Sequence, residues 1–281
     1  MSSFLQFLFE AIALSSPLIL AAMGGYFSER SGVINIALEG NMLAGAIVAA
    51  VVGQAFHPYA GLVAGLAAGV LFSGFHWILT QTYRIDHVVS GMAINAAAFG
   101  CASVLGRRFT DLFSDEPRTI AVWPFFVVAL SLPFLVSLYS RSTRGGLRLL
   151  ATGIDPGKAR LMGVDTTKVR LWALVATGLC CGLAGAQLIS NAGYYTDGMT
   201  AGRGFIALAA LILGGWRPLP TLACCLVFGT LQALQIQFQG TPIMGVEIPR
   251  ELWYCLPYMA AVVAMAGIKR SARAPQGLGK Y

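Results

Sequence analysis

The sequence predicts an all-α polytopic membrane protein, and the amino-acid composition is the first observation behind that prediction. Apolar residues occupy 57% of the 281 positions and glycine occupies 33 more, whereas only 11% of the residues are charged. A soluble domain carries about 25% charged residues, and a disordered chain has few large apolar residues. The composition excludes a soluble enzyme, a disordered tail and a nucleic-acid-binding module, so no nucleic-acid partner is expected.

The second observation is that apolar segments of membrane-spanning length recur along the chain. A helix needs about 20 apolar residues to cross the hydrocarbon core of a bilayer. We predict about nine such helices (eight to ten) in one transmembrane domain over residues 1–281, with Glu10 and Glu39 as the only acidic residues inside them apart from Glu251 at the first position of the last span. The predicted spans are residues 4–26, 33–53, 58–80, 88–106, 120–140, 168–190, 204–215, 219–238 and 251–268.

The third observation is the distribution of basic residues, which predicts the orientation of the chain. Lys and Arg concentrate in the cytoplasmic loops of membrane proteins. The loop 141–170 and the tail 269–281 are both rich in Lys and Arg, and the chain has a net charge of +7. An odd number of spans places the termini on opposite sides. We therefore expect a multi-pass protein with its N-terminus outside and a cytoplasmic C-terminal tail.

The third predicted span and the seventh have unusual features. Gly61, Gly65 and Gly69 are four residues apart and form a stripe against which another helix can pack closely. Residues 204–215 would form a helix only about 18 Å long, against a core of about 30 Å. A re-entrant segment here would place the basic tail outside. We therefore expect a short or broken crossing helix.

Two segments of the chain resemble each other and suggest an inverted repeat. Residues 32–45 align without gaps to residues 202–215, and the two copies would enter the membrane from opposite sides. Many transporters are built from such repeats and handle their substrate where the copies meet. The identical pairs are Gly32/Gly202, Ile36/Ile206, Ala37/Ala207, Leu38/Leu208, Leu43/Leu213 and Gly45/Gly215.

The loop 141–170 contains the signals of a short helix over residues 156–162. Asp155 is a good N-cap, and Pro156 suits the first helical position, where no N–H is needed. Gly163 is placed to end the helix in the left-handed conformation. The helix would present Leu161 and Met162 to a partner protein on the cytoplasmic side. The alternative interpretation is an interfacial helix that rests on anionic membrane lipid.

Three segments give the chain a resemblance to permease subunits of bacterial ABC importers, in the ribose and branched-chain amino acid group. They are SERSGVINIALEGNMLAGA (28–46), ATGIDPGKARLMGVDTTKVR (151–170) with GLAGAQ (182–187), and GRGFIALAALILGGWRP (202–218). Within that group the sequence is most similar to the shorter permease of nucleoside importers, which are often described as simple-sugar importers.

The resemblance implies a function and a set of partners. It implies an inner-membrane permease subunit that forms the path for a nucleoside or a related sugar-like solute. The helix 156–162 would be the coupling helix that docks into the ATPase subunit, with Gly153, Pro156, Ala159 and Gly163 on its motif. Gly157 departs from that motif, because relatives more often have a better helix former there. The implied partners are a second permease (a different chain or a second copy), cytoplasmic ATP-binding subunits and an extracytoplasmic solute-binding protein.

Polar residues inside the predicted spans are candidates for the translocation path. Asn35 and Glu39 are four residues apart and share one helical face, and an ionisable group at this depth needs a protein or water partner. Glu39 could line the path, or it could tie its helix to a neighbouring backbone. Phe205 could stack on a base or a sugar face. The full candidate set is Asn35, Glu39, Asn95, Phe205 and Gln232.

No enzymatic motif is found in the sequence. Gly157-Lys158 is followed by Ala159 and Gly279-Lys280 by Tyr281, so neither pair completes a phosphate-binding P-loop. We expect no cofactor, no metal and no catalytic residue in this chain, with ATP bound by a partner ATPase. The alternative function is a stand-alone secondary transporter of a small polar solute. A secondary transporter gains little from a capped cytoplasmic helix, which favours the ABC permease.

Overall fold

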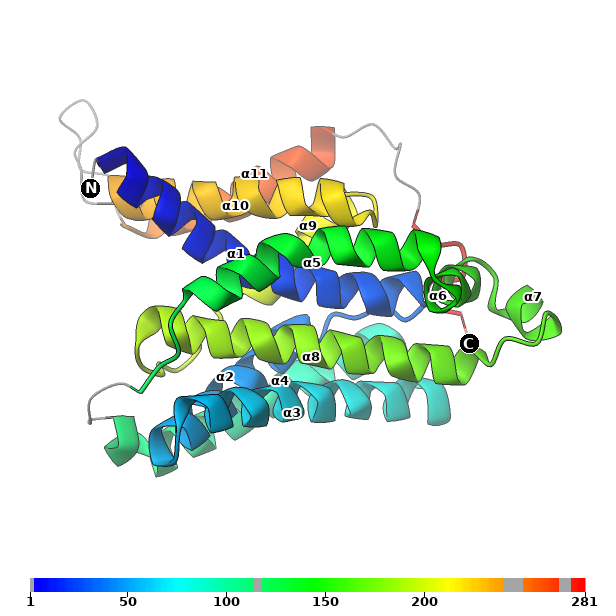
Figure 1. The fold of residues 1–281 in the computed structure, drawn as a ribbon, viewed down its shortest axis with the longest axis horizontal. Helices are drawn as coiled ribbons and strands as arrows, with labels where there is room; N and C mark the ends of the chain where they lie inside the picture. Colours follow the sequence, from blue (N-terminus) through cyan, green and yellow to red (C-terminus); the bar gives the residue numbers. More distant parts are fainter. Residues whose placement is uncertain (1–2, 114–117, 240–249, 268–273, 281) are drawn as a thin grey trace.

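A computed structural model of the protein describes residues 3–113, 118–239, 250–267 and 274–280. In this part of the chain the secondary structure is helical and includes no strand. Most of the helices run roughly parallel or antiparallel along one long axis (Figure 1). The α-helices are α1 (Ser3–Arg30), α2 (Leu38–Ala55), α3 (Pro58–Trp77), α4 (His87–Arg108), α5 (Trp123–Ser142), α6 (Arg144–Ile154), α7 (Pro156–Leu161), α8 (Thr166–Ala192), α9 (Arg203–Leu213), α10 (Pro218–Phe238) and α11 (Arg250–Gly267).

Seven of these helices are long and apolar enough to cross a membrane, which confirms an all-α polytopic membrane fold. They are α1, α2, α3 with its continuation to Thr82, α4, α5, α8 and α10. Helices α9 and α11 occupy the other two predicted spans but are not among these seven, so the count of about nine is not confirmed. The second span is shorter than predicted, because residues 31–37 are not helical and α2 begins at Leu38.

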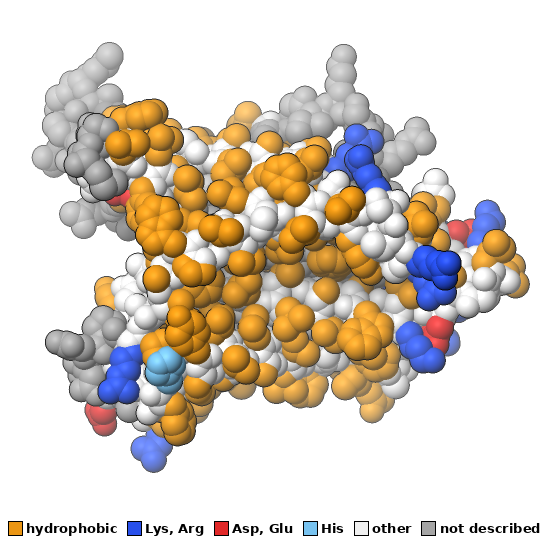
Figure 2. All heavy atoms as spheres, viewed as in Figure 1, with side chains coloured by type: hydrophobic (Ala, Val, Ile, Leu, Met, Phe, Trp, Pro, Cys, Tyr) orange, Lys and Arg blue, Asp and Glu red, His pale blue; other side chains and the backbone are white. Residues whose placement is uncertain are grey.

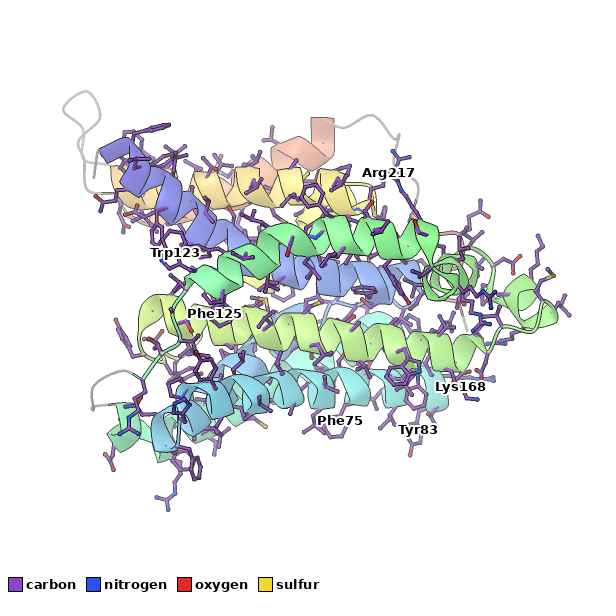
Figure 3. The ribbon with its side chains drawn as sticks, viewed as in Figure 1. Phe75, Tyr83, Trp123, Phe125, Lys168 and Arg217 are labelled. Atoms are coloured by element: carbon purple, nitrogen blue, oxygen red, sulfur yellow. The ribbon has the colours of Figure 1, made fainter. Side chains whose placement is uncertain are left out.

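Large apolar side chains cover the outer surface of the bundle, as expected for contact with lipid. In the view of Figure 2, hydrophobic atoms spread over the middle of the molecule and Lys and Arg gather towards its two ends. Phe75 on α3 is 46% exposed and Tyr83 just beyond α3 is 69% exposed, and both point away from the bundle (Figure 3).

Glycine contacts hold α3 against α2 and α8, which confirms the predicted packing stripe. A Cβ atom on Gly69 would lie 2.3 Å from the carbonyl oxygen of Gly178 in α8, and one on Gly61 would lie 2.4 Å from that of Ala49 in α2. No side chain fits at such distances, so the backbones of these helices are in direct contact. This close packing fixes α2, and therefore the residues at its N-terminus, relative to α3 and α8.

The segment between α8 and α10 crosses the bundle as a loop followed by a short helix. Lys168 near the start of α8 and Arg217 just before α10 lie at the same end of the molecule, where α7 projects (Figures 1 and 3). Because α8 runs from that end to the other, residues 193–217 must return across the bundle. Helix α9 supplies 11 residues of this return, and residues 193–202 and 214–217 supply the rest. A short helix is therefore present at the predicted place, and its role as a membrane-crossing span is still a prediction.

Candidate functional site

Helix α7 has the capped geometry that the sequence predicts. The carboxylate of Asp155 accepts a hydrogen bond from the backbone N–H of Lys158 at 3.0 Å, and Pro156 occupies the first turn. This backbone hydrogen bond is the main cause that holds the pKa of Asp155 below its ordinary value, which keeps the N-cap ionised. Gly163 has a φ of +80° with no atom near its missing side chain, so the left-handed end of the helix requires a glycine here.

Helix α7 divides its predicted coupling residues into two groups. Leu161 and Met162 are 89% and 84% exposed at the tip of the projection. Pro156 and Ala159 are buried against the rest of the chain. Two adjacent apolar side chains with such exposure, on a helix held between α6 and α8, form a small surface suited to contact with another protein.

The base of α7 is connected to two distant parts of the chain. A Cβ atom on Gly153 would lie 2.1 Å from the carbonyl oxygen of Arg30, so the end of α6 packs directly against the end of α1. The carbonyl oxygen of Gly153 also accepts a hydrogen bond from the backbone N–H of Gly277 at 2.9 Å. The C-terminal segment, residues 274–280, therefore lies beside α7 instead of extending as a free basic tail.

The buried side chain of Arg170 holds this C-terminal segment in place. Its guanidinium group donates to the carbonyl oxygen of Lys280 at 2.5 Å and to that of Ser31 at 3.2 Å. It also donates to the Gln81 side chain at 2.7 Å. The sequence offered no signal for this arrangement, because Arg170 counts as one of several loop cations. The remaining tail residues 269–273 lie outside the described residues.

The carboxylate of Glu39 lies at the N-terminus of α9 and binds its backbone N–H groups. The backbone N–H groups of Gly202 and Gly204 donate to the two carboxylate oxygens at 2.8 and 2.6 Å, and Glu39 is 1% exposed. The first N–H groups of a helix lack partners within the helix and attract a negative charge. In the membrane interior such groups must find a partner in the protein. This geometry agrees with the interpretation that Glu39 ties its helix to a neighbouring backbone.

The side chains of Asn35 and Asn95 bind backbone groups at the N-terminus of α2 in the same way. The side-chain oxygen of Asn35 accepts from the N–H of Ala37 at 3.0 Å, and that of Asn95 accepts from the N–H of Gly40 at 2.8 Å. The amide nitrogen of Asn95 also donates to the carbonyl oxygen of Ile36 at 3.0 Å. Both asparagines are buried. Three of the five predicted path residues therefore bind backbone groups at the starts of two helices.

The remaining two path candidates lie in different surroundings. Gln232 lines a cavity of about 410 Å³ between α1, α10, α11 and the start of α9, together with Arg203, Gln235 and Tyr258. Phe205 is 44% exposed and is not among the residues that line this cavity. Glu39 is connected to the cavity wall through Gly202, because Gly202 is flanked by the lining residues Ala201 and Arg203. A path role of these five residues is still a prediction.

A second buried glutamate was not identified from the sequence. Helix α1 extends to Arg30, four residues beyond the predicted span, and therefore includes Glu29. The carboxylate of Glu29, which is 3% exposed, accepts a hydrogen bond from the indole N–H of Trp216, the residue directly before Arg217. The signal in the sequence that could have revealed it is the apolar pattern, which continues through Phe27 and extends the span towards Glu29.

The inverted repeat stays a prediction. Gly32 and Gly202 both have a positive φ, 95° and 76°, as two equivalent turns would have. The helices that follow start at different distances, however, because α2 begins at Leu38 and α9 at Arg203.

The family of the chain follows from its similarity to known proteins. The family described as branched-chain amino acid transport system / permease component matches residues 7–265. The chain belongs to this permease family. Its relatives include the guanosine ABC transporter permease protein NupQ of Bacillus subtilis, 34% identical over 94% of this permease and 92% of that protein. The nucleoside ABC transporter permease protein NupC of Lactococcus lactis is 31% identical over the same shares of the two chains.

A solved structure confirms the fold class of the permease. An inward-facing conformation of an ABC transporter matches with a TM-score of 0.53 and 17% identity, over 92% of this permease and 84% of that chain. The permease is thus a multi-pass component of an ABC importer in the inner membrane, as its family and its apolar helices show.

Proposed function

We propose that this permease forms the translocation path of an ATP-driven importer for nucleosides and that α7 is its coupling helix. The relatives named as guanosine and nucleoside permeases support the solute class. The observation that carries the coupling role is the capped helix α7, which presents Leu161 and Met162 beyond the end of the bundle.

The exposed and the buried coupling residues have different roles. Leu161 and Met162 contact the motor subunit, whereas Ala159 and Pro156 pack α7 onto its own chain. Gly153 allows the end of α6 to touch the end of α1, and Gly163 provides the left-handed end of α7. In this arrangement a force on the tip of α7 is transmitted into the bundle by backbone contacts.

The importer needs partners that supply the functions that this chain is proposed to lack. Two cytoplasmic ATPase subunits bind and hydrolyse ATP, and an extracytoplasmic binding protein delivers the solute. A second permease chain of the same family completes the path. The end of the bundle with α7 and the C-terminal segment faces the cytoplasm, and the start of α1 at the opposite end (Figure 1) faces outwards.

The coupling role can be tested with acidic substitutions at the tip of α7. Leu161→Asp and Met162→Asp should reduce copurification with the ATPase and nucleoside uptake by tenfold or more. A carboxylate buried in the contact with the motor has no partner and costs a few kcal/mol. Leu147→Asp is the matched control, because Leu147 is 55% exposed on α6 and outside the proposed contact. Normal copurification and uptake in both α7 variants would remove the assignment.

The solute class is tested by uptake into cells that produce the complete importer. Labelled guanosine and uridine should accumulate in an ATP-dependent manner and compete with each other, whereas ribose and galactose should not compete. Competition by the sugars and no accumulation of nucleosides would contradict the proposed solute class and leave the coupling role untouched.

The orientation is tested by cysteine labelling in a variant that has no other cysteines. Tyr59→Cys, at the start of α3, should react with an impermeant reagent in intact cells, since Tyr59 is 62% exposed. Met162→Cys should react only after the membrane is permeabilised. The reverse pattern would overturn the proposed topology.

A further inference from the structure

The cavity between α1, α9, α10 and α11 has a polar wall that contains hydrogen-bonding atoms without a protein partner. Gln232 and Gln235 are three residues apart on α10, so both side chains face the same side of that helix. Each is only 8% exposed, although both line the cavity. Arg203 faces them from the first turn of α9, and the ring of Tyr258 completes the wall from α11.

Two buried atoms of this wall lack partners among the described residues. Both atoms are shielded from solvent. Among the described residues, the side-chain oxygen of Gln232 accepts no hydrogen bond and the Nε of Arg203 donates none. Arg203 uses Nη1 instead, to donate to the carbonyl oxygen of Met199 at 2.8 Å. A buried polar atom without a hydrogen-bond partner destabilises the protein. A ligand in the cavity that offers a complementary donor and acceptor would remove this cost.

The chemistry of the wall defines the class of ligand. Among the described residues that line the cavity, Arg203 is the only charged one, so a cationic solute is disfavoured. Arg pairs well with the two acceptors on one edge of a purine, and a glutamine amide both donates to and accepts from a base. An aromatic ring such as that of Tyr258 offers a face on which a base can stack. The volume of about 410 Å³ lies within the range of small-molecule sites, roughly 300–1,000 Å³.

We infer that this cavity binds the base of a purine nucleoside, with Arg203 donating to its acceptor edge and Gln232 accepting from its N–H groups. This inference rests on the proposed function, because it assigns the base-recognising residues of the proposed nucleoside path. Gln235 donates to the same ligand from the next turn of α10. The sugar of the nucleoside lies at the open side of the cavity.

The experiment uses the complete importer in proteoliposomes, with guanosine and 7-deazaguanosine, which lacks one purine acceptor atom, as probes. Gln232→Leu keeps the size of the side chain and removes its hydrogen bonds, and Arg203→Lys keeps the charge and removes the paired donors. Thr230→Ala on α10 is the matched control, because its hydroxyl donates to the carbonyl oxygen of Leu226 in its own helix. ATPase stimulation by the binding protein is measured in parallel.

Gln232→Leu should raise the KM for guanosine about tenfold, as expected for a lost hydrogen bond of about 1.4 kcal/mol. Thr230→Ala should leave both this KM and the binding-protein-stimulated ATPase activity unchanged. Arg203→Lys should weaken guanosine uptake more than 7-deazaguanosine uptake. The ratio of guanosine uptake to 7-deazaguanosine uptake is compared between the variant and the wild type, which cancels any preference of the binding protein itself.

The outcomes separate the inference from the proposed function. If the wild-type importer takes up guanosine and both variants match Thr230→Ala, the cavity is not the base site and the proposed function stands. If the wild-type importer takes up no nucleoside at all, the proposed function fails and the inference fails with it. If Gln232→Leu does not assemble, Gln235→Ala decides the question, because the described residues give the Gln235 side chain no hydrogen bond to lose.

Discussion

Removal of the Glu39 carboxylate should lower the stability of the permease, and uptake should fall as a consequence. The two N–H groups of Gly202 and Gly204 are bound by this one side chain at 2.8 and 2.6 Å, in a position that is 1% exposed. A hydrogen bond to a charged group contributes about 1.5–3 kcal/mol. Because Glu39→Ala removes two such bonds, it should lower the free energy of unfolding by about 3–6 kcal/mol.

Glu39→Gln should have an intermediate effect. The amide has the same size but only one acceptor oxygen, so it can satisfy one of the two N–H groups and directs its own N–H₂ towards the other. We expect the free energy of unfolding to fall by about 1.5–3 kcal/mol, the contribution of one charge-assisted bond. Glu10→Gln is the matched control, since Glu10 is half-buried near the start of α1 and has no hydrogen bond among the described residues.

The assay is thermal unfolding of the purified permease in detergent, followed by the reaction of a thiol dye with buried cysteines. Cys181 and Cys225 are both 0% exposed and become reactive only when the bundle opens. The melting temperature should fall in the order Glu10→Gln, Glu39→Gln, Glu39→Ala, with uptake falling in parallel. If both Glu39 variants melt like the control, the reasoning on capping is refuted. Normal melting with lost uptake would instead assign Glu39 to the path.

Two further predictions concern packing and the C-terminal segment. Gly69→Ala should destabilise the bundle by about 1–3 kcal/mol, because the new Cβ would lie 2.3 Å from the Gly178 carbonyl oxygen. Gly74→Ala on the same helix meets nothing within 4 Å and should melt at or above the wild-type temperature. Arg170→Leu should release the C-terminal segment, seen as faster proteolysis near residue 274 at unchanged cleavage elsewhere. Lys168→Met is its control, and equal protection of the segment in Arg170→Leu would show that the guanidinium does not hold it.

The sequence predicts α7 well because the signals of a short helix are local. Asp155, Pro156 and Gly163 each act on backbone groups within a few residues of themselves, and the helix ends where these residues place its ends. Helix α6 was missed because its local signals favour a different structure. Its first turn contains Gly145 and Gly146, which favour a loop, and it is stabilised by the Thr143 side chain, which accepts from the N–H of Gly146 at 3.0 Å.

The roles of the buried polar residues could not be predicted, because their partners are distant in sequence. Glu39 binds backbone groups more than 160 positions away, and Arg170 binds Lys280 across 110 positions. The sequence identified Glu39, Asn35 and Asn95 as residues that need partners in the membrane. It did not show that the partners are the free N–H groups of helices α2 and α9. Those groups become free only because the chain breaks its helices at residues 31–37 and 193–202.

The contacts of α9 give a physical reason for keeping a short helix in the membrane. Its N-terminus is bound by Glu39 at the start of α2, and the turn after its C-terminus is bound by Glu29 at the end of α1 through Trp216. The end of α1 also touches Gly153 at the base of α7. Because these contacts are close-packed or hydrogen-bonded, a movement of α7 must either carry α9 along or break them. Arg203 stands in the first turn of α9, so a displacement of α9 changes the wall of the cavity.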